Sequence, residues 1–147
     1  MKNIQLSEHF MLSEFTRSNT AARHHFDNTP SPTAIGNLKA LCGHVLEPLR
    51  NFAQQPILIS SGYRSQAVNS AVGGKANSQH LTGEACDIHI PDKATGQRWI
   101  EWMENWLEFD QLAKEKAHPD SPTFWIHVSF SKTRNRQQVL YLTKHPK

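Results

Sequence analysis

Two histidines and one aspartate stand out in this sequence because their side chains and spacing suit a bound metal ion. His80 and Asp87 lie seven positions apart, with Gly83 between them to let the chain reverse direction. His127 follows Asp87 after forty positions. Two imidazoles and one carboxylate leave a zinc ion with one net positive charge, which is enough to acidify a bound water and polarise a carbonyl group. We therefore predict that these side chains hold one zinc ion and leave its fourth position to water.

Other roles for the histidines remain open at this point. The chain has nine histidines in 147 residues, so most of them must have ordinary roles. His89 shares the strand face of Asp87, so it could hydrogen-bond to a metal ligand or serve as a substitute ligand itself. His44 is expected at the edge of a helix. Five more are expected in loops or tails and are not predicted to bind metal: His9, His24, His25, His118 and His145.

Alternating apolar and polar residues predict the strands that must position the site. In residues 85–90 the apolar side chains fall on one face and Asp87 on the other. The same alternation in residues 125–130 places His127 on the polar face. Two strands with the same phase can pair so that Asp87 and His127 converge.

The rest of the sequence predicts helices and strands around this pair. The clearest helix runs from Pro32 to Phe52, with Ser31 as its cap and a kink at Pro48. A short helix capped by Ser13 is expected in an otherwise irregular N-terminal part. The other expected elements are a strand at 56–61, a helix at 65–72, a helix at 95–107, a strand at 109–115 and a helix at 135–142. In the helix at 95–107 the stripe expected to be buried consists of Trp99, Ile100, Met103, Trp106 and Leu107.

Length and composition predict one domain over residues 1–147. Hydrophobic residues make up 37% of the chain, which is ordinary for a soluble globular protein. No window reaches the ~18 apolar residues of a membrane span. Residues 1–8 lack the apolar core of a secretory signal. We expect a monomer of cytoplasmic synthesis, with a phage-type or other non-classical route for release.

Charge and cysteine content argue against two further classes of protein. The net charge of +3 is mild, and the basic residues near the C-terminus lack the interleaved aromatics of a nucleic-acid surface. We interpret them as a solvated tail and expect no nucleic-acid partner. Two cysteines are too few for a disulfide scaffold. Cys42 and Cys86 both stand in apolar patterns and are expected in the core.

One segment resembles the signature of a known enzyme family. Residues 78–87 match, position for position, the Ser-x-His-x-x-Gly-x-Ala-x-Asp signature of the zinc D-alanyl-D-alanine carboxypeptidase family. The resemblance covers roughly residues 10–140. Further segments resemble parts of the family's smaller, often phage-borne members: residues 60–65, Asn69, residues 72–74 and residues 125–129.

This resemblance implies an α+β fold of the hedgehog/DD-peptidase type, with helices packed on a small antiparallel sheet. It implies a zinc-dependent peptidase acting on peptidoglycan stem peptides, with the three predicted ligands binding the zinc. By the same resemblance Arg64 binds substrate, and a guanidinium suits a carboxylate or a scissile carbonyl oxygen. A structural salt bridge is the alternative role for Arg64. Ser78 could donate a hydrogen bond to substrate or cap a turn.

One position departs from the family pattern. Many members carry an acidic residue three positions before the last histidine, as general base, where this chain has Phe124. We expect Glu115 to serve instead, with Asp110 and Asp120 as the next choices. If no carboxylate serves, the alternative is a non-catalytic module that binds cell-wall peptides or a partner and keeps the fold, with or without the zinc.

Overall fold

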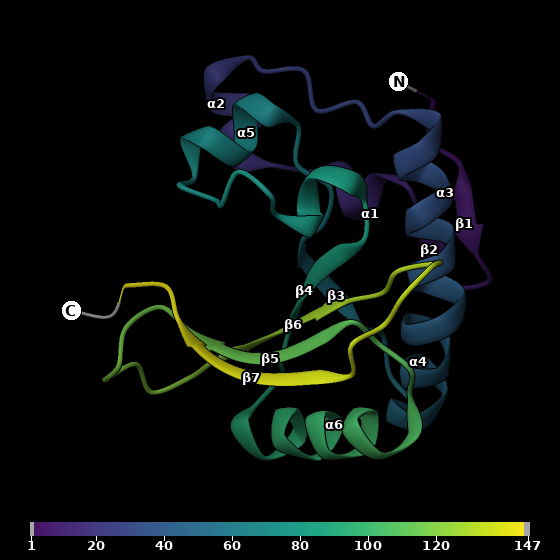
Figure 1. The fold of residues 1–147 in the computed structure, drawn as a ribbon, viewed down its shortest axis with the longest axis vertical. Helices are drawn as coiled ribbons and strands as arrows, with labels where there is room; N and C mark the ends of the chain where they lie inside the picture. Colours follow the sequence, from purple (N-terminus) through teal and green to yellow (C-terminus); the bar gives the residue numbers. More distant parts are fainter. Residues whose placement is uncertain (1, 146–147) are drawn as a thin grey trace.

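A five-stranded sheet forms the centre of the computed structural model, which describes residues 2–145 (Figure 1). The strand order is β3-β4-β6-β5-β7, and neighbours are antiparallel except for β5 and β7, which are parallel. The strands span Leu58–Ser61 (β3), Ala85–His89 (β4), Gln111–Lys116 (β5), Trp125–Ser129 (β6) and Gln138–Thr143 (β7). Helices packed on this sheet give the α+β fold that the sequence predicts.

The long helix that runs beside the sheet begins where the sequence indicates and has a π-helical turn just before Pro48, where a kink was predicted. It consists of α3 (Pro32–Leu41), the π-helical turn η1 (Cys42–Leu46) and α4 (Glu47–Ala53). The Ser31 hydroxyl accepts a hydrogen bond from the Ala34 amide, so the predicted cap is present. Pro48 has no amide hydrogen and its ring would clash with the carbonyl of the preceding turn, so the backbone widens there.

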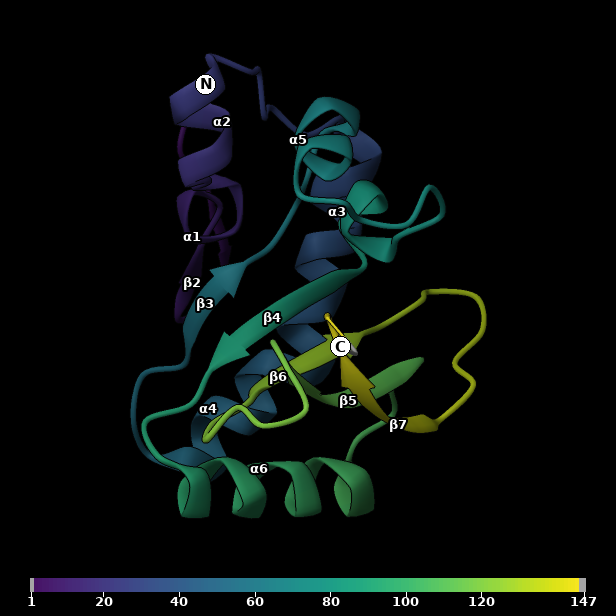
Figure 2. The same ribbon diagram turned by 90° about the vertical axis from the view of Figure 1, so that its left-hand side faces the viewer.

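Helix α6 (Lys93–Trp106) covers the apolar face of the sheet. In Figure 1 and Figure 2 it lies at one end of the molecule, with α2 and α5 at the other and the sheet between them. Trp99, Ile100 and Met103 are buried as predicted. Trp106 is 74% exposed, so its predicted burial is wrong. Trp106 is the last residue of α6, and the backbone becomes extended at Leu107. The buried stripe of the helix therefore ends before Trp106.

The segment predicted as a helix at 135–142 is strand β7, so that prediction is wrong. Without β7, the backbone groups along one edge of β5 would have no partner in the sheet. Residues 138–143 supply that partner in parallel register. Gln137 turns the chain into the strand with a left-handed backbone, φ 54°. The tertiary pairing thus overrides the weak helical pattern.

The N-terminal part has more regular structure than the sequence indicates. It forms a two-stranded hairpin and two short helices: β1 (Gln5–Ser7), β2 (Phe10–Met11), α1 (Ser13–Thr16) and α2 (Asn19–His24). Ser13 does not cap α1, whose N-cap residue is Leu12, with no side-chain cap. The Glu14 carboxylate instead accepts a hydrogen bond from the Met11 amide, 2.7 Å away. A serine cap does occur at α2, where Ser18 accepts from Ala21.

Two further predictions can be compared with the structure. Cys42 and Cys86 are both buried and free, as predicted. Within residues 2–145, no helix combines the length and apolar character that a membrane crossing requires.

Candidate metal centre

The pairing of β4 with β6 brings Asp87 and His127 together. The two residues are direct partners in the antiparallel register. Their side chains lie on the face of the sheet away from the apolar core, and His127 Nδ1 is 3.0 Å from Asp87 Oδ1. The predicted convergence of these two residues is confirmed.

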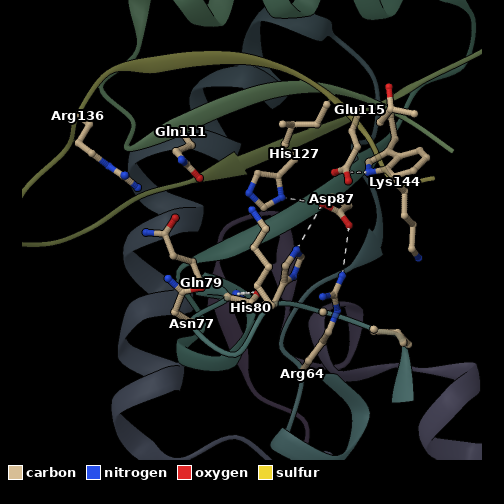
Figure 3. Close-up of a pocket in the computed structure, with 18 residues that line it drawn as sticks. Arg64, Asn77, Gln79, His80, Asp87, Gln111, Glu115, His127, Arg136 and Lys144 are labelled. Atoms are coloured by element: carbon tan, nitrogen blue, oxygen red, sulfur yellow. Dashed lines mark hydrogen bonds and ion pairs between the residues drawn. The ribbon is translucent and has the colours of Figure 1, made fainter. Parts of the chain in front are cut away.

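A short 3-10 helix, η2 (Gln79–Thr82), brings His80 to the same place. Gly83 ends it in a left-handed conformation, φ +77°, and a Cβ there would lie 2.4 Å from the Ala34 carbonyl oxygen. Only glycine fits this turn, which returns the chain to β4. His80 Nε2 then lies 3.5 Å from Asp87 Oδ1 (Figure 3).

The donor set of these three residues fits a zinc ion. One ligand atom from each of His80, Asp87 and His127 lies within 4.8 Å of the others. His80 Nδ1 is 2.7 Å from the Gly62 carbonyl oxygen, to which its N–H donates. That hydrogen bond orients the imidazole so that Nε2 faces Asp87, the arrangement found in histidines that bind metals.

The charge of Asp87 also suits a ligand. Burial alone would disfavour its ionised form, but the adjacent His80 and His127 outweigh burial and hold the pKa of this carboxyl below its usual value. Asp87 is therefore ionised at neutral pH and can bind a cation without first losing a proton.

Arg64 lies at the edge of the same cluster. Its amide donates to the His80 carbonyl oxygen, 3.0 Å away, so the backbone of the two residues is coupled. Its Nη2 is 3.8 Å from Asp87 Oδ2, a long ion pair that leaves the guanidinium able to reach into the cleft. Burial lowers the pKa of Arg64, although Asp87 counteracts it. Its predicted role toward substrate stays a prediction.

Asn69 organises the loop beside Arg64, a role that the family resemblance at this position did not specify. It lies on α5 (Gln66–Ala71), the predicted helix, and is 1% exposed. Its side chain accepts from Arg64 Nη1 at 3.3 Å and donates to the Lys75 carbonyl oxygen at 2.8 Å. A Cβ on Gly74 would lie 2.1 Å from Asn69 Oδ1, so this contact requires glycine there.

Among the carboxylates proposed as general base, Glu115 is the one that lines the cleft with the cluster. It is opposite Trp125 in the β5–β6 register, and its Oε1 accepts a hydrogen bond from Trp125 Nε1 at 3.1 Å. Figure 3 shows Glu115 and Asp87 among the side chains that line the same pocket. Burial, with the nearby charge of Asp87, raises the pKa of Glu115.

The other acidic candidates and Phe124 are placed differently. Asp110 is 4% exposed and binds Arg136 through both carboxylate oxygens, at 2.8 and 2.9 Å. Asp120 is exposed and outside the lining of the cleft. Phe124 lies in the apolar core, where a Cβ on Gly96 would be 3.0 Å from its ring. The departure at Phe124 therefore falls on the core side of β6.

Two smaller predictions concern Ser78 and His89. Ser78 Oγ accepts from the His80 amide at 3.2 Å, so it caps η2, and the residue also lines the cleft. His89 is exposed at the end of β4 and does not belong to the metal-type cluster. Its possible role as a substitute ligand has no geometric support.

The cluster lies in a cavity of about 450 Å³. Several polar side chains in its wall come from separate elements with no common motif. These are Lys75, Asn77, Gln79, Gln111, Arg136 and Lys144. Arg136 and Lys144 belong to the basic residues that were expected in a solvated tail, and that prediction is wrong for these two, because both line the cavity.

Comparison with known proteins agrees with this geometry. The family model described as Peptidase M15 matches residues 8–129, which include all three residues of the cluster. No curated protein matches the chain at a significant level.

Proposed function

Because this chain belongs to the Peptidase M15 family, we propose that it is a zinc-dependent peptidase that hydrolyses peptide bonds in peptidoglycan stem peptides. M15 peptidases are zinc-dependent, and the family indicates action on cell-wall peptides in general. The observation that supports the proposal most strongly is the convergence of His80, Asp87 and His127 on one point inside a cavity. The proposed bond is of the D-Ala-D-Ala carboxypeptidase or endopeptidase type.

In this proposal each residue of the site has a separate task. His80, Asp87 and His127 would hold the zinc. When bound, the zinc would act as a Lewis acid and lower the pKa of a water molecule. Glu115 would accept the proton of the attacking water through Oε2, because Oε1 already accepts from Trp125. Arg64 would donate hydrogen bonds to the carbonyl oxygen as negative charge develops there. Ser78 would bind the peptide from the rim of the cleft.

Purified sacculi provide the test. Incubated with the zinc-loaded protein, they should release soluble product, and a chelator should stop the release. Free alanine would identify a carboxypeptidase, whereas released stem-peptide fragments would identify an endopeptidase. Absence of both products from zinc-loaded, folded protein would contradict the proposal.

A non-catalytic wall-binding module is the second candidate, and Phe124 is the feature that favours it. Phe124 occupies the core rather than the cleft, and Glu115 lines the cleft, so the departure does not remove the carboxylate from the site. Binding to sacculi without release of product would favour this module over the peptidase.

A further inference from the structure

The three residues of the cluster are held in the fold in different ways. Asp87 and His127 lie on neighbouring strands, β4 and β6, and are direct partners in the register of the sheet. His80 lies on η2, a 3-10 helix of four residues outside the sheet. Strand pairing therefore fixes the separation of Asp87 and His127, whereas the place of His80 depends on the contacts that η2 makes with the rest of the chain.

On one side, η2 is bonded to the segment that follows β3. The His80 carbonyl oxygen accepts a hydrogen bond from the Arg64 amide at 3.0 Å, and the His80 ring is 2.7 Å from the Gly62 carbonyl oxygen. Strand β6, which carries His127, is two strands away from β3 in the sheet. These contacts therefore hold His80 to one side of the cluster and do not reach the other.

The Gln79 side chain makes the connection on that other side. Gln79 immediately precedes His80, and its Nε2 donates a hydrogen bond to Asp110 Oδ2 at 2.9 Å. Asp110 lies just before β5, and its amide donates to the carbonyl oxygen of Ser129, the last residue of β6, at 2.8 Å. The bond between Gln79 and Asp110 therefore ties η2 to the strand that carries His127 and to the strand beside it.

Arg136 holds the Asp110 carboxylate in the orientation that this bond requires. The Arg136 amide and Nε donate to Oδ1 at 2.9 and 2.8 Å, and its Nη2 donates to Oδ2 at 2.9 Å. Asp110 is 4% exposed, so water has little access to either oxygen. Because both oxygens are bonded to one guanidinium group, the plane of the carboxylate is fixed and Oδ2 faces Gln79.

We propose that Gln79 is a positioning residue for the metal ligand His80, and that Asp110 and Arg136 act through Gln79. Gln79 and Arg136 both line the cavity (Figure 3). In this proposal the guanidinium of Arg136 maintains the geometry of the cluster. Arg136 lies beyond residues 8–129, so part of the connection comes from outside the family match. The catalytic use of the metal rests on the proposed function, whereas the positioning concerns metal binding alone.

Zinc affinity provides the test. Gln79→Met keeps roughly the length of the side chain and removes its hydrogen-bond donor. We expect the zinc dissociation constant of this variant to rise by about 10-fold, as is typical when a residue that orients a metal ligand is lost. Competition with a chromophoric zinc chelator measures the constant without any assay of peptide release. Gln66→Met, on the exposed surface of α5 and outside the lining of the cleft, makes the same exchange and should leave the constant unchanged.

A second variant tests whether Arg136 acts through Gln79. Arg136→Lys keeps the positive charge and loses the planar group that bonds both oxygens of Asp110. It should also raise the zinc dissociation constant, by no more than Gln79→Met does. Since both changes break the same connection, the double variant should have the constant of Gln79→Met alone, whereas independent losses of stability would add. Circular dichroism verifies folding, and Arg136→Lys alone provides the test if Gln79→Met does not fold.

The outcomes separate this inference from the proposed function. An unchanged zinc dissociation constant in Gln79→Met, or effects of the two variants that add, overturns the positioning role even if the unaltered protein hydrolyses stem peptides. Raised constants that do not add support the positioning role even if no peptide is cut, and the absence of hydrolysis then overturns the peptidase alone.

Discussion

Residues 2–145 contain two clusters of metal-type side chains, and the two differ in how far they are buried. His80, Asp87 and His127 lie at the base of a cleft, where one histidine is oriented by a backbone carbonyl and its other nitrogen faces the aspartate. The second cluster, Glu8, His9 and Glu47, lies on an exposed or half-buried surface.

In that second cluster the Glu47 carboxylate already accepts several hydrogen bonds from the protein. Glu47 accepts hydrogen bonds from the Ser7 hydroxyl, from the His9 amide at 2.7 Å and from the His9 ring at 2.6 Å. These bonds fasten the N-terminal hairpin to α4. The comparison teaches that residue types and proximity are insufficient: a metal site also needs a lone pair from each residue that points to a shared vacant point.

The largest effect expected from this difference is on zinc content. His127→Ala removes one of three donors, so zinc affinity should fall by more than about 100-fold, whereas His9→Ala should leave it unchanged. Metal analysis after dialysis against a weak chelator measures both. Equal zinc content in the two variants would remove the distinction between the clusters.

Glu115→Gln tests the reacting carboxylate with the ligands intact. Loss of the proton acceptor should lower kcat by about 10²–10⁴-fold while zinc content is preserved. Assays of peptide release, with metal analysis of the same sample, separate these effects. Full activity of this variant would assign the general base to another group.

The Asp110 carboxylate, like that of Glu47, already accepts hydrogen bonds from the protein, here from the Arg136 side chain. The hydrogen bond from the Arg136 side chain is the main cause that holds the pKa of Asp110 at about 2, below its ordinary 3.8. Since the folded-state pKa is the lower one, the stabilisation is complete above about pH 4 and is lost as the pH falls towards 2.

Asp110→Asn should therefore lower the free energy of unfolding at neutral pH by about 1–2 kcal/mol, with solvent around the half-exposed Arg136 limiting the effect. The variant should also lose less stability between pH 4 and pH 2 than the unaltered protein. Urea unfolding at several pH values measures both. An identical pH dependence in the two proteins would contradict this role.

Glu47→Gln should have the smallest effect. Its hydrogen bonds are largely at the surface, so the free energy of unfolding should fall by about 1 kcal/mol or less, with no change in zinc content. Thermal unfolding with parallel metal analysis measures this. A loss of zinc comparable to that in His127→Ala would show that the second cluster also binds the metal.

The sequence was sufficient to predict the parts of the site that depend on local pattern. A strand period of two leaves a single phase that buries the apolar face, so the meeting of Asp87 with His127 followed from alternation. The start of α3 at Pro32, with Ser31 as its N-cap, followed from the residue types that favour these two positions.

Other features depend on partners that only the folded chain brings together. Strand β7 forms because β5 has an open edge, and nothing within residues 138–143 specifies that edge. Asp110 was a candidate base until the fold placed Arg136 against it. Lys75 and Lys144 likewise line one cleft only because the fold brings their two segments to it, which neither local sequence indicates.

The most direct test of the account is a crystal structure of the zinc-loaded protein with anomalous scattering measured at the zinc edge. We expect one strong peak at about 2.0–2.2 Å from His80 Nε2, Asp87 Oδ1 and His127 Nδ1, with a water as fourth ligand. A peak at Glu8, His9 and Glu47 instead, or no peak near Asp87, would contradict it.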